Sequence, residues 1–323
     1  MEMIIPLLHY SNIALTILCT SIGAGIGSGW VGVAAIAAVD KAPRAYPEIL
    51  KTSIIGLALV ETGALLGVVM ALILILTDSF AYATASSLHV AIAEYGIIGC
   101  LGICGFTVGI ASALPAVAAL HSITRQPFFS ASILNIMILS QSIIQTPVIF
   151  AFIVSLVIKL QFESLVSLHD SIRCIASGLC LGIGSIGPVI GLAHFAKTAC
   201  KSIGINRTAY SNIVPFTFMS QAVIETPIIF TLLIALLILA QPSSNADILP
   251  FSIIMLSASL ATAIGTIAPG ISAGKTAASA CATIANDPAH YAIVSRTSFL
   301  AQGLIDTAPV YALLISLLIL LLH

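Results

Sequence analysis

The sequence predicts an all-α membrane protein in which eight transmembrane helices form four tandem parallel hairpins. Three observations carry this prediction: an apolar composition, eight apolar stretches that can cross a bilayer, and a fourfold internal repeat. Hydrophobic residues make up 59% of the 323 residues, charged residues 7%, and the mean hydropathy is +1.16. No soluble domain of this length buries so much apolar surface. The formal net charge of −1 also argues against a nucleic-acid partner.

The apolar stretches alternate with short polar turns along the whole chain. In order they cover residues 12–39, 52–76, 96–120, 131–158, 172–196, 212–240, 251–284 and 292–322. Each is longer than the roughly 20 residues that a transmembrane helix needs, so each is predicted to be one span. We interpret the cysteines in these stretches as small buried apolar residues, and we expect no metal site.

The basic residues gather in every second turn. The turns near 40–51, 121–130, 197–210 and 285–296 hold eight of the 11 lysines and arginines, whereas the opposite turns hold two. Because basic loops stay in the cytoplasm, the first group is predicted to be cytoplasmic and both termini to lie on the other side. The remaining cation, Lys275, lies inside the seventh span. The sequence leaves open whether it reaches a lipid headgroup or lines an interior space.

The repeat is centred on one polar position in each even-numbered span. Glu61, Gln145, Glu225 and Asp306 recur at intervals of about 80 residues, and a threonine directly follows each of them. Such a repeat indicates one supersecondary unit each time, here a helical hairpin. The four hairpins are expected to cover residues 1–92, 93–170, 171–250 and 251–323, all in the same orientation.

Small residues dominate the first helix of each hairpin. The first repeat reads GAGIGSGWVG over residues 23–32, and its five glycines align with Gly, Ala, Ser or Thr in the other repeats at every position but one. Small residues let helix backbones approach closely in lipid, where packing replaces the missing hydrophobic drive. The pattern predicts a tightly packed inner layer, with the bulkier helices that carry the acids outside it.

These features together resemble the rotor-ring c subunit, or proteolipid, of F-type and V-type rotary ATPases. The loop Arg125-Gln126-Pro127 looks like the family's Arg-Gln-Pro signature. The run DTAP at 306–309 resembles its Asp-x-x-Pro form, and ETG at 61–63 resembles a Glu form. The loop at 205–207 departs from the family because it lacks the proline, and the fusion of four hairpins into one chain is a further departure.

The resemblance implies a homo-oligomeric ring in a bacterial plasma membrane or an organellar inner membrane. In such a ring the carboxylates of the outer helices exchange ions with the stator a-subunit, and the cytoplasmic loops contact the central stalk. The chain is then not an enzyme by itself, has no catalytic residue and needs no cofactor beyond the transported ion. The loop residues implied to meet the stalk are Arg44, Arg125, Gln126, Pro127 and Arg207, although their charge also fits simple membrane topology.

Three of the four central positions can carry an ion. A charged group at bilayer depth costs on the order of 3 kcal/mol or more, so Glu61, Glu225 and Asp306 are predicted to be kept for function. Desolvation favours the neutral acid, which can face lipid where an ionised one cannot. Gln145 keeps the hydrogen-bonding shape of a protonated acid but releases no proton, so its hairpin is predicted to be ion-silent.

The sequence favours protons as the carried ion, with sodium as the alternative. A hard cation needs several oxygen ligands. The possible supporting ligands are Thr62, Thr226, Thr307, Gln221 and Gln302. At the matching depth of the first helices stand Ser28, Ser112, Leu192 and Ala273, with no glutamine among them.

A stand-alone secondary transporter is the alternative from another functional class. Transporters of that kind often place broken helices around one central site, and many of their repeats are inverted. Here the repeats are parallel. The only interruptions expected near the middle of a span are at the prolines after Gln145, Glu225 and Asp306.

Overall fold

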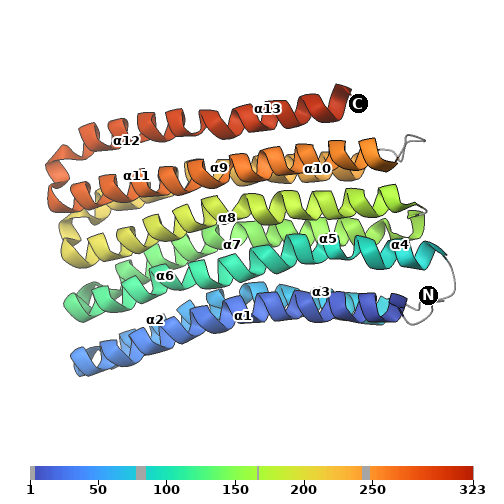
Figure 1. Cartoon of the computed structure of the whole chain (residues 1–323). Helices are drawn as coiled ribbons and strands as arrows, with labels where there is room; N and C mark the ends of the chain where they lie inside the picture. The colour runs from blue at the N-terminus through green and yellow to red at the C-terminus, as the bar shows by residue number, and fades with distance from the viewer. Residues whose placement is uncertain (1–3, 78–84, 166, 242–247, 323) are drawn as a thin grey trace.

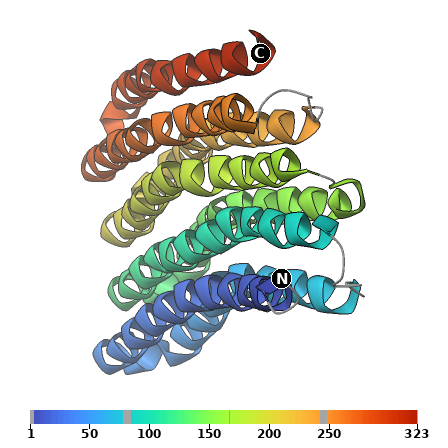
Figure 2. The ribbon, with the colours of Figure 1, turned by 45° about the vertical axis from the view of Figure 1, so that its right-hand side comes forward.

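Eight long helical spans lie side by side in two layers. The computed structural model describes residues 4–77, 85–165, 167–241 and 248–322, and no strand occurs within these ranges. Each of the eight predicted spans falls on a helix long and apolar enough to cross a membrane, which confirms the predicted all-α membrane fold. The hairpins follow one another in chain order, from blue to red in Figure 2.

The first helix of each hairpin forms the inner layer. This layer comprises α1 (Ile4–Lys41), α4 (Ala85–Ala93), α5 (Tyr95–Ile97), a π turn (Ile98–Gly102), α6 (Ile103–Arg125), α8 (Leu168–Ile205), α10 (Ile248–Gly265) and α11 (Ile267–Asn286). The outer layer comprises α2 (Tyr46–Val60), α3 (Thr62–Thr77), α7 (Ser130–Leu160), α9 (Tyr210–Ala240), α12 (Tyr291–Ile305) and α13 (Thr307–Leu322).

Short 3₁₀ turns join the two helices of each hairpin at one end of the molecule. These turns are Pro43–Ala45, Pro127–Phe129, Arg207–Ala209 and Pro288–His290. Proline at the first position of three of them fits a turn whose first N–H has no partner. A further 3₁₀ turn, Phe162–Ser164, follows α7. Both chain ends lie at the opposite end of the molecule (Figure 1), so the hairpins are parallel.

Glycines set the spacing of the inner layer. A Cβ atom added to Gly191 of α8 would overlap the carbonyl oxygen of Gly270 in α11, and one added to Gly27 of α1 would overlap that of Gly109 in α6. The backbones of neighbouring inner helices therefore touch directly. Because only glycine has no Cβ atom, these helices could not approach so closely with any other residue.

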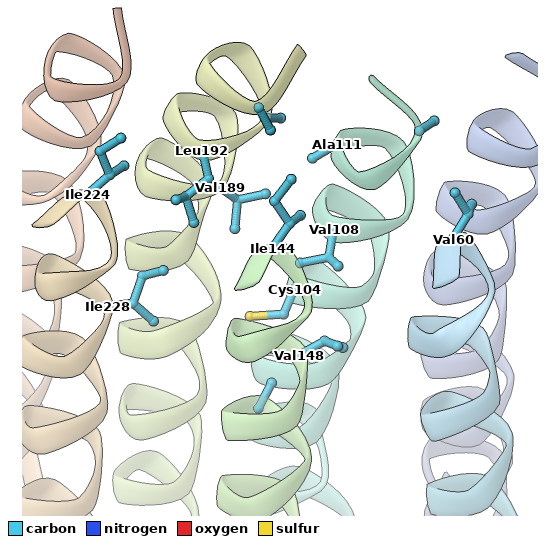
Figure 3. Close-up of a cluster of buried hydrophobic side chains, with 14 of the residues drawn as sticks. Val60, Cys104, Val108, Ala111, Ile144, Val148, Val189, Leu192, Ile224 and Ile228 are labelled. Atoms are coloured by element: carbon cyan, nitrogen blue, oxygen red, sulfur yellow. The ribbon is translucent and has the colours of Figure 1, made fainter. Parts of the chain in front are cut away.

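Larger apolar side chains fill the space between the two layers. Val108 of α6, Ile144 of α7, Val189 of α8 and Ile224 of α9 are fully buried, and Figure 3 shows them converging between the helices. Six of the seven cysteines are also buried as free thiols, which fits their interpretation as small apolar residues.

Polar contacts join the first two inner helices near the terminal end. His9 Nδ1 of α1 lies 2.8 Å from Glu94 Oε1, and Asn12 Nδ2 donates to Glu94 Oε2 at 3.4 Å and to the Ala91 carbonyl at 2.9 Å. Both His9 and Glu94 are almost fully buried. A carboxylate buried between two helices is tolerated because it has these partners.

The interruptions of the spans differ from those expected. The helices α7 and α9 continue through Pro147 and Pro227, whereas the outer helices of the first and last hairpins break at Glu61 and Asp306. At the last of these sites Pro309 removes an N–H and crowds the carbonyl of Ile305, where α12 ends. The break at Glu61 has no proline within the next turn.

The glycine contacts predict a sharp difference between two equally conservative substitutions. Gly191→Ala should destabilise the protein by about 1–3 kcal/mol, because the new methyl group has no room against α11. Gly303→Ala should be neutral or stabilising, because nothing lies within 4 Å of the added Cβ and alanine favours the helix. Thermal unfolding in detergent measures both variants. Equal stability of the two would contradict this account of the inner layer.

Candidate functional site

The four central positions lie at one common depth. Glu61 separates α2 from α3, Asp306 separates α12 from α13, and Gln145 and Glu225 are the middle residues of α7 and α9. Each is therefore the midpoint of an outer span of more than 30 residues. Because the hydrocarbon core is about 30 Å thick and a helix rises 1.5 Å per residue, the midpoint of such a span lies well inside it.

Two of the central side chains contact the preceding hairpin. Gln145 is buried, and its Nε2 atom donates to the Leu59 carbonyl of α2 at 2.5 Å. Glu225 is half-buried, and its carboxyl interacts with the Thr146 hydroxyl of α7. Gln145 and Glu225 thus lie at contacts between outer helices of successive hairpins, and each interacts with a group from the preceding repeat.

The acids of the two end hairpins have different surroundings. Glu61 is exposed, since no hairpin precedes it in the chain. Asp306 is half-buried, and its Oδ1 atom has no hydrogen-bond partner among the described residues. The structure therefore brings the acids to equivalent places but not into contact with one another.

A glutamine lies one helical turn before three of the central positions. Gln141 Nε2 donates to the carbonyls of Gly56, at 3.2 Å, and Ser112, at 2.8 Å. Gln302 Nε2 contacts the hydroxyls of Ser298, at 2.9 Å, and Ser220, at 3.4 Å. These glutamines join the hairpins just beside the central positions.

The third glutamine differs from the other two. Gln221 is fully buried, yet neither its Nε2 nor its Oε1 atom has a partner within the described part of the chain. The hydroxyls of Ser140 and Thr217 are also buried and have no partner among the described residues. In the repeat, Ser140 is equivalent to Gly56, a partner of Gln141, and to Ser220, a partner of Gln302. Thr217 is equivalent to Ser298, the other partner of Gln302. Such groups are costly unless they bind water or a ligand.

The threonine hydroxyls donate to the backbone of their own helices. Thr62 Oγ1 donates to Ala58 at 3.5 Å, Thr226 Oγ1 to Ala222 at 3.2 Å, and Thr307 Oγ1 to Leu304 at 2.8 Å. Their lone pairs remain available as acceptors. Leu192 and Ala273, on the inner helices at this depth, are fully buried and bring no side-chain oxygen.

The residues that the family resemblance places against a central stalk lie at the end of the molecule where the short 3₁₀ turns join the hairpins, here called the short-loop end. Arg44, Arg125 and Arg207 are exposed, and Gln126 Nε2 donates to the Gly204 carbonyl of the next hairpin at 3.1 Å. A groove of about 520 Å³ runs between the loops of hairpins 2 and 3, and Pro127 is part of its lining. The sequence reasoning missed Phe128 in this groove. Its ring is fully exposed, and only its place directly after the loop signature pointed to it.

Comparison with known proteins links both ends of the chain to one family. The sequence profile of the ATP synthase C subunit matches residues 13–74 and 256–319, which include Glu61 and Asp306. The ATP synthase c subunit of Chloroflexus aurantiacus is 33% identical over 69 residues, covering 21% of this chain and 91% of that protein. The ATP synthase c subunit of Enterococcus hirae is 40% identical over 68 residues, covering 21% of this chain and 96% of that protein. The chain is thus similar to these proteins at the scale of one hairpin.

The glutamine contacts predict different costs for one substitution at two equivalent positions. Gln141→Met should lower the free energy of unfolding by about 1–3 kcal/mol, because it leaves the Gly56 and Ser112 carbonyls without their donor. Gln221→Met should cost little or stabilise the protein, because its amide has no partner in the described chain. Thermal unfolding of both variants in detergent tests this. A larger loss for Gln221→Met would reveal a ligand or water that the amide holds.

Proposed function

This chain belongs to the c-subunit family of ATP synthases, and we propose that it is the ion-carrying rotor subunit of a rotary ATP synthase or ATPase. The observation that carries the proposal is the equivalence of Glu61, Glu225 and Asp306 at the midpoints of three outer spans. A lone acid in a membrane helix can be an incidental polar group with a local partner. Three acids at one depth, each at the same place in its hairpin, call for a shared role.

The proposed mechanism follows from the cost of charge in hydrocarbon. Each acid is neutral while it faces lipid, either protonated or paired with a cation. It exchanges the ion where a stator subunit provides access to water, as the family resemblance implies. Each elementary charge that crosses the membrane releases about 2.3 kcal/mol per 100 mV. Several crossings per turn then supply the torque for ATP synthesis, or are driven by ATP hydrolysis.

The hydrogen bond of Gln145 supports protons as the carried ion. Its amide N–H donates to the Leu59 carbonyl, two residues before the central position of the preceding hairpin. A protonated carboxyl can donate to a carbonyl in the same way, whereas an ionised carboxylate cannot. By alignment of the repeats, the equivalent carbonyls are those of Ile143 for Glu225 and Val223 for Asp306. The proton-loaded acids would be held by these bonds.

Gln145 makes its own hairpin silent in this mechanism. An amide has no proton to release near pH 7, so each chain carries three ions per four hairpins. Fewer ions per turn deliver less energy per ATP, which favours a machine that spends ATP to pump.

One observation favours sodium as the second candidate ion. The Oε1 atom of Gln302 and the Oδ1 atom of Asp306 are both buried and unpartnered among the described residues, and they lie one helical turn apart. Two such oxygens supply part of the set of oxygen ligands that a hard cation needs. Leu192 and Ala273, the inner-helix residues aligned with the acids in hairpins 3 and 4, add no side-chain oxygen, so protons remain the proposal.

Ring closure is supported by positions that are buried in the middle hairpins and exposed at the ends. Gly29 is exposed on α1, whereas the equivalent Ala113 and Ala193 are 0% and 1% exposed because an inner helix packs on them. Ala268 and Ser272 are exposed on α11, whereas the equivalent Gly187 and Gly191 are buried. The first hairpin therefore lacks the neighbour that would cover Gly29, and the fourth hairpin lacks the neighbour that would cover Ala268 and Ser272. A second copy supplies both when its first hairpin packs on the fourth hairpin of its neighbour.

The fourth hairpin presents a groove where the next copy would pack. It has a volume of about 560 Å³, lies between α11 and α12, and is lined by Lys275, Thr276, Ser279 and Thr297, among others. Thr297 is exposed, whereas the equivalent Phe216 of hairpin 3 is fully buried. In the ring, Glu61 would face the fourth hairpin of the preceding copy as Gln145 faces α2.

The other partners are the stator a-subunit beside the outer helices and central-stalk subunits at the short loops. The exposed Arg44, Arg125, Phe128 and Arg207 support the second contact, since arginine and aromatic side chains are common anchors of interfaces. The basic turns support placing this end in the cytoplasm.

The mechanism predicts that two substitutions change the number of ions moved per ATP in opposite directions. Glu225→Gln should lower the number of ions moved per ATP by about one third, since each chain then has two carriers instead of three. Gln145→Glu should raise it by about one third, because it restores the fourth carrier. The ratio is measured with the purified complex in vesicles. A ratio unchanged by both variants would exclude these residues as carriers.

Carbodiimide labelling checks the same residues chemically. Glu225 and Asp306 should react at slightly alkaline pH, because a carboxyl group at bilayer depth is stable against lipid only in its neutral form, the form that a carbodiimide attacks. Labelling should stop ATP-coupled ion flux. Protection by sodium is expected only if sodium is the carried ion, and absence of labelling at both acids would count against the rotor.

Ring closure predicts a selective effect at Gly29. Gly29→Leu should abolish ring formation while the chain stays helical, because nothing within 4 Å crowds the position in a single chain. Gly303→Leu is the matched control. Its equivalents Ala58, Ser142 and Ala222 are exposed even between neighbouring hairpins, so the position faces outward. Native mass spectrometry reports the assembly, and equal assembly of both variants would refute the proposed contact.

A further inference from the structure

Residues that are equivalent in the repeat lie across one groove from each other on the inner layer. A groove of about 650 Å³ runs between α6 and α8, and its lining includes Phe106 and Ile110 of α6 together with their equivalents Ile186 and Ile190 of α8. Leu114, one helical turn beyond Ile110, also lines this groove. The positions at these successive turns therefore form a stripe along each inner helix, and the stripes of neighbouring helices flank a common groove.

The glycine contacts show that neighbouring inner helices stand at the same height. A Cβ atom added to Gly27 would meet the carbonyl of Gly109, two residues before the position equivalent to Gly27. A Cβ atom added to Gly109 would meet the carbonyl of Gly23, again two residues before the equivalent position. In the same way, one added to Gly274 would meet Gly191. Because the offset is the same in both directions, equivalent residues lie level with each other.

The next position of the stripe has a different residue in every hairpin. These residues are Trp30, Leu114, His194 and Lys275. Trp30 is the only tryptophan of the chain and is 46% exposed, and Lys275 is exposed on α11. Within one chain the two residues belong to the first and the last hairpin. They become neighbours only where the fourth hairpin of one copy packs on the first hairpin of the next.

Both residues lie close to the depth of the central acids. Trp30 and Lys275 each follow by two residues the inner-helix position aligned with the acids, which is Ser28 in hairpin 1 and Ala273 in hairpin 4. Two residues correspond to about 3 Å along a helix. The four-carbon stem of a lysine is too short to bring its ammonium group from this depth to the headgroups, because half of the hydrocarbon core is about 15 Å thick. Lys275 therefore needs a partner inside the membrane.

No carboxylate is placed to be that partner. Between residues 248 and 305 the only acidic residue is Asp287, which lies at the short-loop end beside His290, at 2.9 Å. Asp40 of the next copy would lie ten residues, or about 15 Å, beyond Trp30. The central acids belong to the outer layer. Lys275 points away from that layer, because it is exposed and lies about 200° around the helix from the fully buried Ala273.

We propose that the contact between two copies includes a cation–π pair, in which the Lys275 ammonium group of one copy lies over the indole ring of Trp30 of the next copy. This inference rests on the proposed ring and names a contact that closes it. Lys275 also lines the open groove between α11 and α12, so the pair continues the surface on which the next copy packs. Tryptophan is the best aromatic partner for a cation, and the attraction is stronger away from water.

The pair gives the boundary between copies a chemistry that the boundaries within the chain lack. At the same height those boundaries combine Trp30 with Leu114, Leu114 with His194, and His194 with Lys275. A fourth hairpin that met any hairpin other than the first would lose the tryptophan. The pair thus favours the order in which each fourth hairpin is followed by a first one.

Cross-linking tests whether the two residues adjoin. The double variant Trp30→Cys with Lys275→Cys, assembled in the membrane and treated with a short bismaleimide, should give a ladder of linked copies on a denaturing gel. The variant His194→Cys with Lys275→Cys is the matched control, because its link forms within one chain and should leave the chain monomeric. The two single variants, Trp30→Cys and Lys275→Cys, control for links through the native cysteines, six of which are buried.

Substitutions test whether the attraction requires the charge and the ring. Lys275→Met should weaken the contact between copies by about 10- to 30-fold, and Lys275→Arg should keep it, because arginine also pairs with indole. Trp30→Leu should cost as much as Lys275→Met, and the two together should cost little more than either alone. His194→Met should have no effect. Native mass spectrometry of rings at increasing detergent concentration measures these losses, and the emission of the single tryptophan should change with Lys275→Met only in assembled rings.

The outcomes separate the pair from the ring. If the unsubstituted chain forms no ring, both proposals fail. If rings form but the double cysteine variant gives no ladder, or if Lys275→Met dissociates no more readily than His194→Met, the ring stands and the pair is refuted. Equal losses for Lys275→Arg and Lys275→Met would also refute it. Circular dichroism checks that each variant is helical, and should Lys275→Met not fold, the cross-linking and the arginine variant decide the question.

Discussion

An ionised carboxylate has no stable place against lipid hydrocarbon, and this constraint fits the places of the two acids that have a preceding hairpin. Glu225 and Asp306 are half-buried at contacts between outer helices rather than at the centre of the molecule or on its outermost surface. In the proposed mechanism, a fully buried acid could not exchange an ion with a partner, and a fully exposed one would have to stay neutral throughout. The edge of a helix contact meets both needs.

The contact itself depends on the packing of the inner layer. Glycines bring the inner helices into backbone contact, as between Gly191 and Gly270, while the outer helices carry larger side chains. Each hairpin is therefore narrower across its inner helix than across its outer helix, and a row of such hairpins curves. The spacing of the outer helices, and with it the distance from each central residue to its neighbour, follows from the close approach of the inner ones.

The spans and their repeat were predictable because they follow local composition. Apolar length identified all eight helices, and a regular repeat aligned the central positions. The partners of those positions were not predictable in the same way. Gln145 bonds a backbone carbonyl 86 residues away, and Gln141 bonds two carbonyls on two different helices. Because every residue has a backbone carbonyl, the sequence does not show which carbonyl will accept a side-chain hydrogen bond. The break at Glu61 was missed for a related reason, since no proline marks it.

Fusion of four hairpins gives each central position a fixed neighbour. In a ring of separate identical hairpins, every site is the same and a silent one would silence all. Here Gln145 always follows Glu61 and precedes Glu225, so one hairpin can have an amide at its central position while the others keep a carboxyl group. The surroundings have diverged as well: Gln141 and Gln302 each bond the preceding hairpin, whereas Gln221 finds no partner in the described chain. In the proposed ring, covalent linkage thus allows central positions with different side chains and contacts to follow one another in a fixed order, because the peptide chain decides which hairpins are adjacent.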